Sequence, residues 1–317
     1  MLGKQTVQMG FGDMEATSRV PDGHFLKKID AQIDWRLFQK VLEPLYHPTQ
    51  GRPSHPPLMM FKALLLQQWY SLSDPGLEDA ICDRLSFQRF LGLSLTDPVP
   101  DETRICRFRN RLAQEGLGER LFALLEEQLQ VKGLIVRRGS LIDATLVKGQ
   151  PHRPRRGEPS FDPDADWTRR GKDGFYGYKV HLSVDQGSDL IRRLALTAAS
   201  VSESHLFEEM VIGDEAAVFA DGAYAKDARK AWLRGRGVFC GIINRPWRYR
   251  PISAPQKKRN TCYSRVRRAV ERVIGTLKRH YGMDRCRYVG GMRNRSHFWL
   301  KGICYNLKKM LVLQGAN

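Results

Sequence analysis

Three acidic residues stand at positions of this chain where a carboxylate is costly or isolated. Asp143 lies in the middle of the aliphatic segment SLIDATLV, which predicts a strand buried on both faces. Asp221 directly follows a second short buried segment, AVFA. Glu271 is the single carboxylate of a helix expected over residues 262–282, where 3.6-residue spacing places it between an apolar stripe and a basic face.

Carboxylates gathered from two strands and a helix can perform metal-dependent chemistry. Sites in open α/β sheets collect where strands end, so neighbouring strands can bring Asp143 and Asp221 close to Glu271. Three such carboxylates repel one another unless a cation neutralises them. Mg²⁺ or Mn²⁺ suits oxygen ligands, and two ions about 4 Å apart can serve an in-line phosphoryl displacement. The competing interpretation is that Glu271 only forms an ion pair with Arg267 or another basic neighbour at i±4.

The charge distribution indicates a polyanionic partner. The formal net charge is +18, and residues 244–317 hold 19 lysines and arginines against two acids, a net of +17. Nucleic acid is the leading candidate, ahead of an anionic membrane. We find no apolar run of about 18 residues and no signal peptide, so we expect a cytoplasmic, nucleoid-associated protein. The six cysteines form no CxxC pair and are expected to be reduced, mostly buried thiols.

The first part of the chain is expected to form an N-terminal helical domain over residues 1–132. The run PLMMFKALLLQQWY predicts a buried helix, and residues 101–114 predict another with an arginine face of Arg104, Arg107 and Arg111. A turn with two prolines precedes that helix, which favours a helix-turn-helix-like unit that binds DNA. A solvated arginine face on a structural helix is the alternative.

Residues 133–317 are expected to form an α/β sheet with helices on both faces. The order is a strand, a loop over residues 149–174, a strand hairpin, a helix, a strand, a helix and a strand, followed by a basic segment and two helices, the last packing on the sheet. The basic segment RPWRYRPISAPQKKR can stack aromatic rings on bases while its cations follow phosphates. Its candidate DNA contacts are Arg245, Trp247, Arg248 and Tyr249. A disordered basic linker is the alternative.

Several segments together resemble bacterial DDE transposases of the insertion-sequence-five kind, from about His47 to the C-terminus. They are LIDATLVK, GYKVHLSVD, LTAASVSES, FADGAY, and the series Arg267, Glu271 and Lys278, with three and six residues between its members. The resemblance implies a ribonuclease-H-like core, the three acids as metal ligands, and Arg267 and Lys278 as contacts to the terminal DNA. The family signature has a tyrosine three residues before the arginine, where this chain has Ser264.

The resemblance and the acidic triad predict a transposase that binds double-stranded DNA at the inverted-repeat ends of its own element. Metal-dependent cleavage would expose a 3′-hydroxyl, which then attacks target DNA. Because two ends are joined, a homodimer is expected. The alternatives are a metal-dependent nuclease without strand transfer and a domesticated, transposase-derived DNA-binding regulator.

Overall fold

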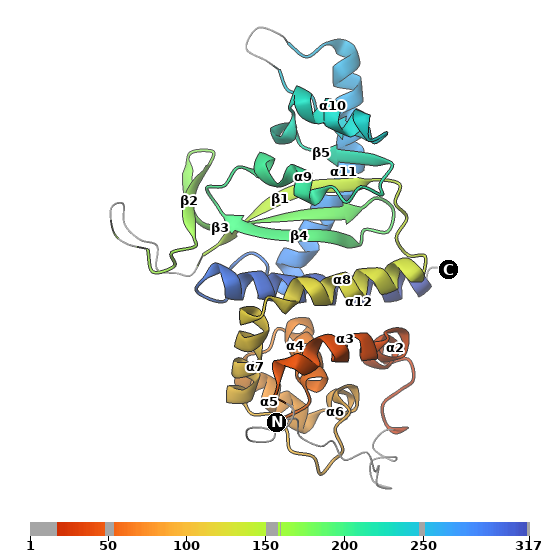
Figure 1. Cartoon of the computed structure of the whole chain (residues 1–317), viewed down its shortest axis with the longest axis vertical. Helices are drawn as coiled ribbons and strands as arrows, with labels where there is room; N and C mark the ends of the chain where they lie inside the picture. Colours follow the sequence, from red (N-terminus) through yellow and green to blue (C-terminus); the bar gives the residue numbers. More distant parts are fainter. Residues whose placement is uncertain (1–17, 48–53, 150–157, 159, 247–250, 316–317) are drawn as a thin grey trace. The chain divides into compact units, whose positions relative to one another are not determined.

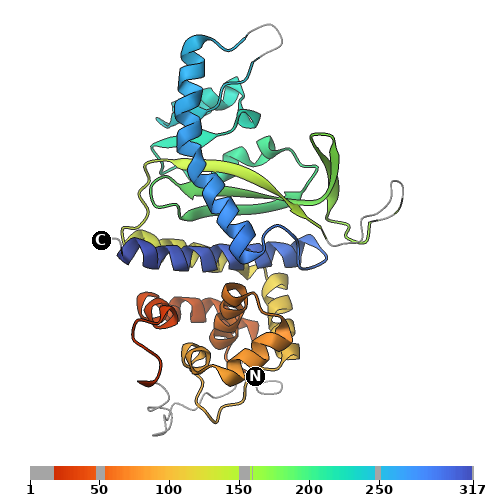
Figure 2. The ribbon, with the colours of Figure 1, turned by 180° about the vertical axis from the view of Figure 1, so that it is seen from behind.

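The computed structural model describes residues 18–47, 54–149, 158, 160–246 and 251–315, and the chain divides into two compact units. A helical unit comprises Met1–Gln128 together with Trp299–Asn317, and a sheet unit comprises Leu129–Phe298. The long helices α8 (Leu117–Val131) and α12 (Gly291–Gly315) carry the chain from one unit to the other (Figures 1 and 2). Within the described residues, none of the helices combines the length and the apolar character needed to cross a lipid bilayer.

The helical unit is built around α4, whose residues are nearly all buried, as PLMMFKALLLQQWY predicts. Its neighbours in this unit are the shorter helices α2 (Phe25–Gln32), α3 (Trp35–Leu42), α5 (Asp74–Asp83), α6 (Leu85–Leu91) and α7 (Glu102–Gln114), while α4 itself spans Pro57–Tyr70. Arg109 of α7 makes two bonds of 2.7 Å to Asp74 of α5, and Gln67 of α4 donates to the same carboxylate at 2.6 Å. The carboxylate of Asp74 therefore joins three helices.

The last helix belongs mainly to this unit, although we expected it to pack on the sheet. The indole N–H of Trp69 donates to the carbonyl of Cys304 at 3.1 Å, and the ring of Phe122 lies 4.8 Å from that of Trp299. The apolar side chains of this helix complete the helical core because α4 and α8 present the complementary apolar surface.

The sheet unit holds a mixed sheet with the order β4-β3-β1-β5-β6. These strands are β1 (Ser140–Lys148), β3 (Asp173–Asp185), β4 (Ile191–Ala198), β5 (Ala217–Ala220) and β6 (Phe239–Ile242). β3 runs antiparallel to β1 and β4, whereas β5 and β6 run parallel to β1. The expected α/β class, a mixed sheet preceded by a helical region, is confirmed. One strand was not expected: β2 (Asp166–Arg170) lies in the predicted loop and pairs with the first residues of β3.

Helices cover both faces of this sheet (Figures 1 and 2). On one face lies α11 (Ala254–Tyr281), and on the other lie α9 (Phe207–Met210) and α10 (Asp227–Gly235). Side chains alternate along β1, so Ile142 joins the cluster under α9 and α10. α11 begins eight residues before the expected helix, because Ser253 and Gln256 form a capping box at its start.

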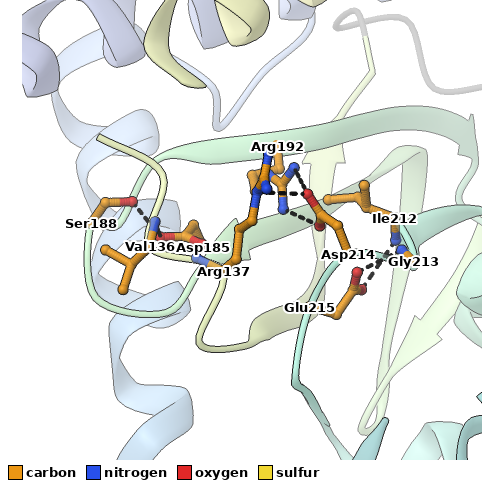
Figure 3. A network of polar contacts seen from close by, with 9 residues as sticks. All are labelled: Val136, Arg137, Asp185, Ser188, Arg192, Ile212, Gly213, Asp214 and Glu215. Atoms are coloured by element: carbon orange, nitrogen blue, oxygen red, sulfur yellow. Dashed lines mark hydrogen bonds and ion pairs between the residues drawn. The ribbon is translucent and has the colours of Figure 1, made fainter. Parts of the chain in front are cut away.

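A polar network fixes the edge of the sheet where β1 begins (Figure 3). Asp185, at the end of β3, accepts the backbone N–H groups of Val136 and Arg137 at 3.0 and 2.8 Å. Arg192 of β4 holds Asp214, in the loop before β5, through bonds of 2.7 and 3.0 Å, and Arg137 contacts that same carboxylate at 3.0 Å. The starts of β1, β4 and β5 are thereby held in register.

The six cysteines are free thiols, as expected, but most are not buried. Cys286 and Cys304 are buried, whereas Cys82 and Cys262 are exposed. Cys82 and Cys262 lie on solvent-exposed faces of two different helices, α5 and α11, where a small side chain loses little by not being buried.

Gly177 of β3 has no room for a side chain. Its φ is +149°, and a Cβ atom there would lie 2.3 Å from the carbonyl oxygen of Val147 and 2.5 Å from the nitrogen of Gly149. We expect Gly177→Ala to lower the free energy of unfolding by about 3 kcal/mol, because rigid backbone must shift. Denaturant unfolding measures this. Gly235→Ala, with no atom within 4 Å of the added Cβ, is the matched control and should change little.

His181 of β3 should make stability depend on pH. The ring is 1 % exposed, its Nε2 lies 3.0 Å from the Thr197 hydroxyl, and burial lowers its pKa from 6.5 to about 4, with Lys179 adding to the effect. The unfolded chain therefore binds a proton below pH 6.5 that the folded chain refuses, so stability falls as pH drops from 6.5 to 4. Urea unfolding across this window should show a smaller fall for His181→Gln than for the wild type. Equal falls would contradict the assignment.

Candidate active site

Strand register brings the two predicted aspartates side by side. β1 and β5 are parallel neighbours, and Ile142 pairs with Ala220. The next residue on each strand is an aspartate, Asp143 within β1 and Asp221 immediately after β5. Because paired residues of adjacent strands point to the same face, both carboxylates lie on the α11 side of the sheet.

A guanidinium from α11 joins the two carboxylates. Arg267 Nη2 lies 3.1 Å from Asp143 Oδ2, and Nη1 lies 3.4 Å from Asp221 Oδ1. Arg267 is 7 % exposed, and its Nε has no hydrogen-bond partner among the described residues. The predicted contact of Arg267 with DNA stays a prediction. In the structure Arg267 lies against the two acids, because the mostly buried carboxylate of Asp143 and the partly exposed carboxylate of Asp221 attract the cation that α11 carries over them.

Glu271 lies one turn after Arg267 on α11 and is exposed. Arg267 forms its ion pairs with Asp143 and Asp221. An ion pair between Glu271 and Arg267, which was the competing interpretation of Glu271, therefore does not explain the position of Arg267. The negative charge of Glu271 nevertheless contributes to the raised pKa of Asp143. The helix therefore supplies both a cation and a carboxylate to the same edge of the sheet.

The surroundings of Asp143 disfavour the ionised form of its carboxyl group. Burial raises its pKa above the ordinary value, and the charges of Asp221 and Glu271 raise it further. Arg267 opposes this shift, as does the Ala144 backbone N–H, which donates to Oδ1 at 2.9 Å. The negative charge of the three carboxylates therefore exceeds the positive charge of Arg267 between the aspartates.

The donor set fits a hard divalent cation in its chemistry. The candidate ligands are carboxylate oxygens, and two of them already share a cation, the guanidinium of Arg267. Across the ranges that the structure describes, no three acidic, histidine or cysteine side chains are close enough together to hold a metal ion. Arg267 stands between Asp143 and Asp221, so a metal ion would have to replace it there.

Two further predicted DNA contacts lie in the described part of the sheet unit. Lys278 is half-buried, and its Nζ donates to the carbonyl of Leu146 in β1 at 3.2 Å. Arg245 is exposed, and its side chain lies against Gly222, the residue after Asp221, with Cγ 2.7 Å from where a Cβ would be. Trp247, Arg248 and Tyr249 lie outside the described residues.

The arginines of α7 do not share one environment. Arg104 contacts Asp101 at 3.4 Å, and Arg111 donates to the carbonyl of Leu45 at 2.8 Å, so both support the helical unit. Arg107 is exposed. Arg111 is exposed as well, and DNA contact by these three arginines stays a prediction.

The departure from the family signature also has a structural counterpart. Ser264 is exposed, and the neighbouring Tyr263 packs its ring edge-on against Phe219 and Phe239 at 5.9 and 6.0 Å. Tyr263 therefore packs on aromatic side chains of β5 and β6.

Two residues near the site were missed by sequence reasoning. Glu203 begins the turn η2 (Glu203–Leu206), and Tyr224 ends the turn η3 (Gly222–Tyr224) that follows Asp221. The charges of Asp143 and Asp221 raise the pKa of both side chains. The pattern around Glu203 indicated only a short capped helix, although Glu203 lies within LTAASVSES, one of the segments that carry the family resemblance.

Comparison with known proteins gives matches over most of the chain. Residues 14–111 match a family described as "Transposase domain (DUF772)", and residues 135–307 match "Transposase DDE domain". The second match covers more than half of the chain and includes Asp143, Asp221 and Glu271. Neither match distinguishes the insertion-sequence-five group from other DDE transposases.

Two solved structures show weak likeness. The piggyBac transposase synaptic complex with hairpin DNA is 11 % identical at a TM-score of 0.39, with 95 % of this chain and 79 % of that chain covered. The pre-cleavage Mos1 transpososome is 10 % identical at a TM-score of 0.22, with 89 % and 85 % covered.

Removal of the Arg267 cation should expose the strain in the site. We expect Arg267→Met to lower the free energy of unfolding at pH 7 by up to about 3 kcal/mol, since Asp143 loses its partner while it stays mostly buried. Asp143→Asn should recover part of this loss in the double variant. Denaturant unfolding of the two single variants and the double variant measures the coupling. Strictly additive effects would show that the contact is energetically unimportant.

Proposed function

Because this chain belongs to the transposase DDE domain family, we propose that Asp143, Asp221 and Glu271 form the centre at which it cleaves and transfers DNA strands. The chain is a DDE transposase, an enzyme of metal-dependent DNA cleavage and transfer. The observation that supports this assignment is the convergence on one side of the sheet of two register-matched aspartates and the helix that carries Glu271.

The reaction we propose exchanges one phosphorus–oxygen bond for another in each step. Water attacks the phosphorus at the element end, the bond to the 3′-oxygen breaks, and that oxygen leaves as a 3′-hydroxyl. This hydroxyl then attacks a target phosphorus, a new bond forms, and the 3′-oxygen of the target strand leaves. Atoms and charge balance without an oxidant, reductant or covalent protein intermediate.

Mg²⁺ or Mn²⁺, as two ions, would neutralise the carboxylates and the developing charge on the phosphate. Asp143, Asp221 and Glu271 are the residues that would hold them. Arg267 offsets part of the charge of the two aspartates in the free chain, and its planar fork suits phosphate equally well. We therefore propose that Arg267 exchanges from carboxylate to DNA phosphate when substrate binds, which would reconcile its buried position with a DNA contact.

Further DNA contacts in this proposal follow the distribution of cations. Arg245 is exposed beside the turn of Asp221, and Arg265, Arg268 and Arg272 are exposed on α11, the helix of Glu271. We propose that double-stranded DNA lies along this surface and reaches Lys278. We also propose that residues 1–132 form a DNA-binding domain, with Arg104, Arg107 and Arg111 as its candidate contacts. Residues 133–298 would form the catalytic domain, and a homodimer would join the two element ends.

The assignment predicts loss of chemistry with retention of binding. We expect Asp143→Asn, Asp221→Asn and Glu271→Gln each to reduce strand cleavage and transfer by roughly 10³-fold or more. Binding of the terminal repeat should persist, because none of these changes removes a cation. The assay follows a labelled linear DNA end with Mg²⁺, with and without a chelator. Glu209→Gln, an exposed glutamate of α9, is the matched control.

Three outcomes would count against the proposal. Undiminished transfer in any of the three variants would remove that residue from the site. Cleavage without joining by the wild type would favour a nuclease. Binding of the repeats without cleavage, with or without metal, would favour a DNA-binding regulator.

A further inference from the structure

The turn that carries Glu203 lies beside the turn that follows Asp221. η2 begins at Glu203, after β4, and it contacts η3, which begins immediately after Asp221. Glu203 is half-buried. Two chain segments separated by β5 thus place Glu203 beside the turn that follows Asp221, and the following inference rests on the function proposed for Asp143, Asp221 and Glu271.

A buried arginine holds the two turns together. Arg229 of α10 is 4 % exposed and donates to the Tyr224 carbonyl at 2.8 Å. The same guanidinium donates to the carbonyl and the hydroxyl of Ser204 at 2.7 and 3.0 Å, and to Glu208 at 2.8 and 3.1 Å. We call these contacts of Arg229 the Arg229 clamp. Because Ser204 adjoins Glu203 and Tyr224 ends the turn that follows Asp221, the clamp fixes the backbone at Glu203 relative to the backbone at Asp221.

A lysine from the sheet anchors the other side of the Glu203 turn. Lys179 of β3 is 7 % exposed, and its Nζ donates to the carbonyl of Val201 at 2.6 Å. On β3, Lys179 pairs with Leu146 of β1, the strand of Asp143. The segment before Glu203 is therefore tied to the central strands, and the positive charge of Lys179 acts on the Glu203 carboxylate.

A hydroxyl without a partner lies within the field of these acids. Tyr224 is 1 % exposed, and its OH has no hydrogen-bond partner among the residues that the structure describes. Burial raises its pKa most, and Glu203 contributes more than Asp143 or Asp221. Burial also raises the pKa of Glu203, and Asp143 and Asp221 raise it further. A buried, unsatisfied donor is costly unless a ligand or a rearranged side chain completes it.

We propose that Glu203 is a fourth carboxylate of the active site, held there by the Arg229 clamp, and that its charge contributes to binding of the divalent cation. The buried Tyr224 hydroxyl has no partner among the described residues and is available to donate to Glu203 or to a ligand oxygen. Glu203 thereby extends the acidic site from the α11 side of Asp221 to the side of η2.

Direct binding of Mn²⁺ to the full chain tests this proposal without DNA or turnover. Free Mn²⁺ is measured by electron paramagnetic resonance during titration of the wild type, Glu203→Gln, Glu203→Asp and Asp143→Asn. We expect Glu203→Gln to weaken Mn²⁺ affinity by roughly 10-fold, which corresponds to about 1.4 kcal/mol. Glu203→Asp should recover part of the loss because it restores the charge. Strand cleavage at limiting Mn²⁺ should follow the same order.

Glu209→Gln is the matched control, since it removes an exposed glutamate six residues away and should bind Mn²⁺ like the wild type. Wild-type affinity in Glu203→Gln, with weakened affinity in Asp143→Asn, would overturn the role of Glu203 alone. Wild-type affinity and full strand transfer in Asp143→Asn would overturn the proposed site as a whole. Circular dichroism and melting temperature check that each variant is folded.

Discussion

Two carboxylates share one buried guanidinium at the centre of the sheet unit, and the remaining features of the site are arranged around that contact. Arg267 lies 3.1 Å from Asp143 and 3.4 Å from Asp221. The helix that carries it, α11, follows all the strands in the sequence. A buried pair of this kind costs desolvation on both sides, so it contributes little net stability. What it provides is a concentration of negative charge that one arginine only partly offsets, which is the condition for binding a further cation.

Polar contacts outside the site set its geometry. The network at the starts of β1, β4 and β5 fixes strand register, and the register places Asp143 beside Asp221 (Figure 3). The Arg229 clamp performs the same task for the turns on the opposite side of Asp221. In both places a buried arginine binds a carboxylate with two N–H groups, and Arg229 also binds two backbone carbonyls, which restricts the backbone more than apolar packing alone.

The excess positive charge lies next to this acidic centre without cancelling it. The outward face of α11 carries Arg265, Arg268, Arg272 and Arg279, all exposed, whereas Arg267 on the inward face is buried. A phosphate backbone can therefore be attracted by one face of the helix while the reacting groups lie at the other. A single helix with two charge environments suits an enzyme whose substrate is a polyanion and whose catalytic groups are anions.

Local patterns were sufficient to identify the strand around Asp143, the strand that ends before Asp221, the buried helix α4 and the helix that carries Glu271. Each depends on periodicity and propensity over a few residues, which the chain carries wherever it folds. Tertiary structure alone decided that Arg267 lies on the aspartates, that the turn of Glu203 contacts the turn after Asp221, that β2 pairs with β3, and that the end of α12 completes the helical core. These outcomes depend on contacts between residues distant in sequence, and on which desolvated charge lies nearest to which, so no local pattern encodes them.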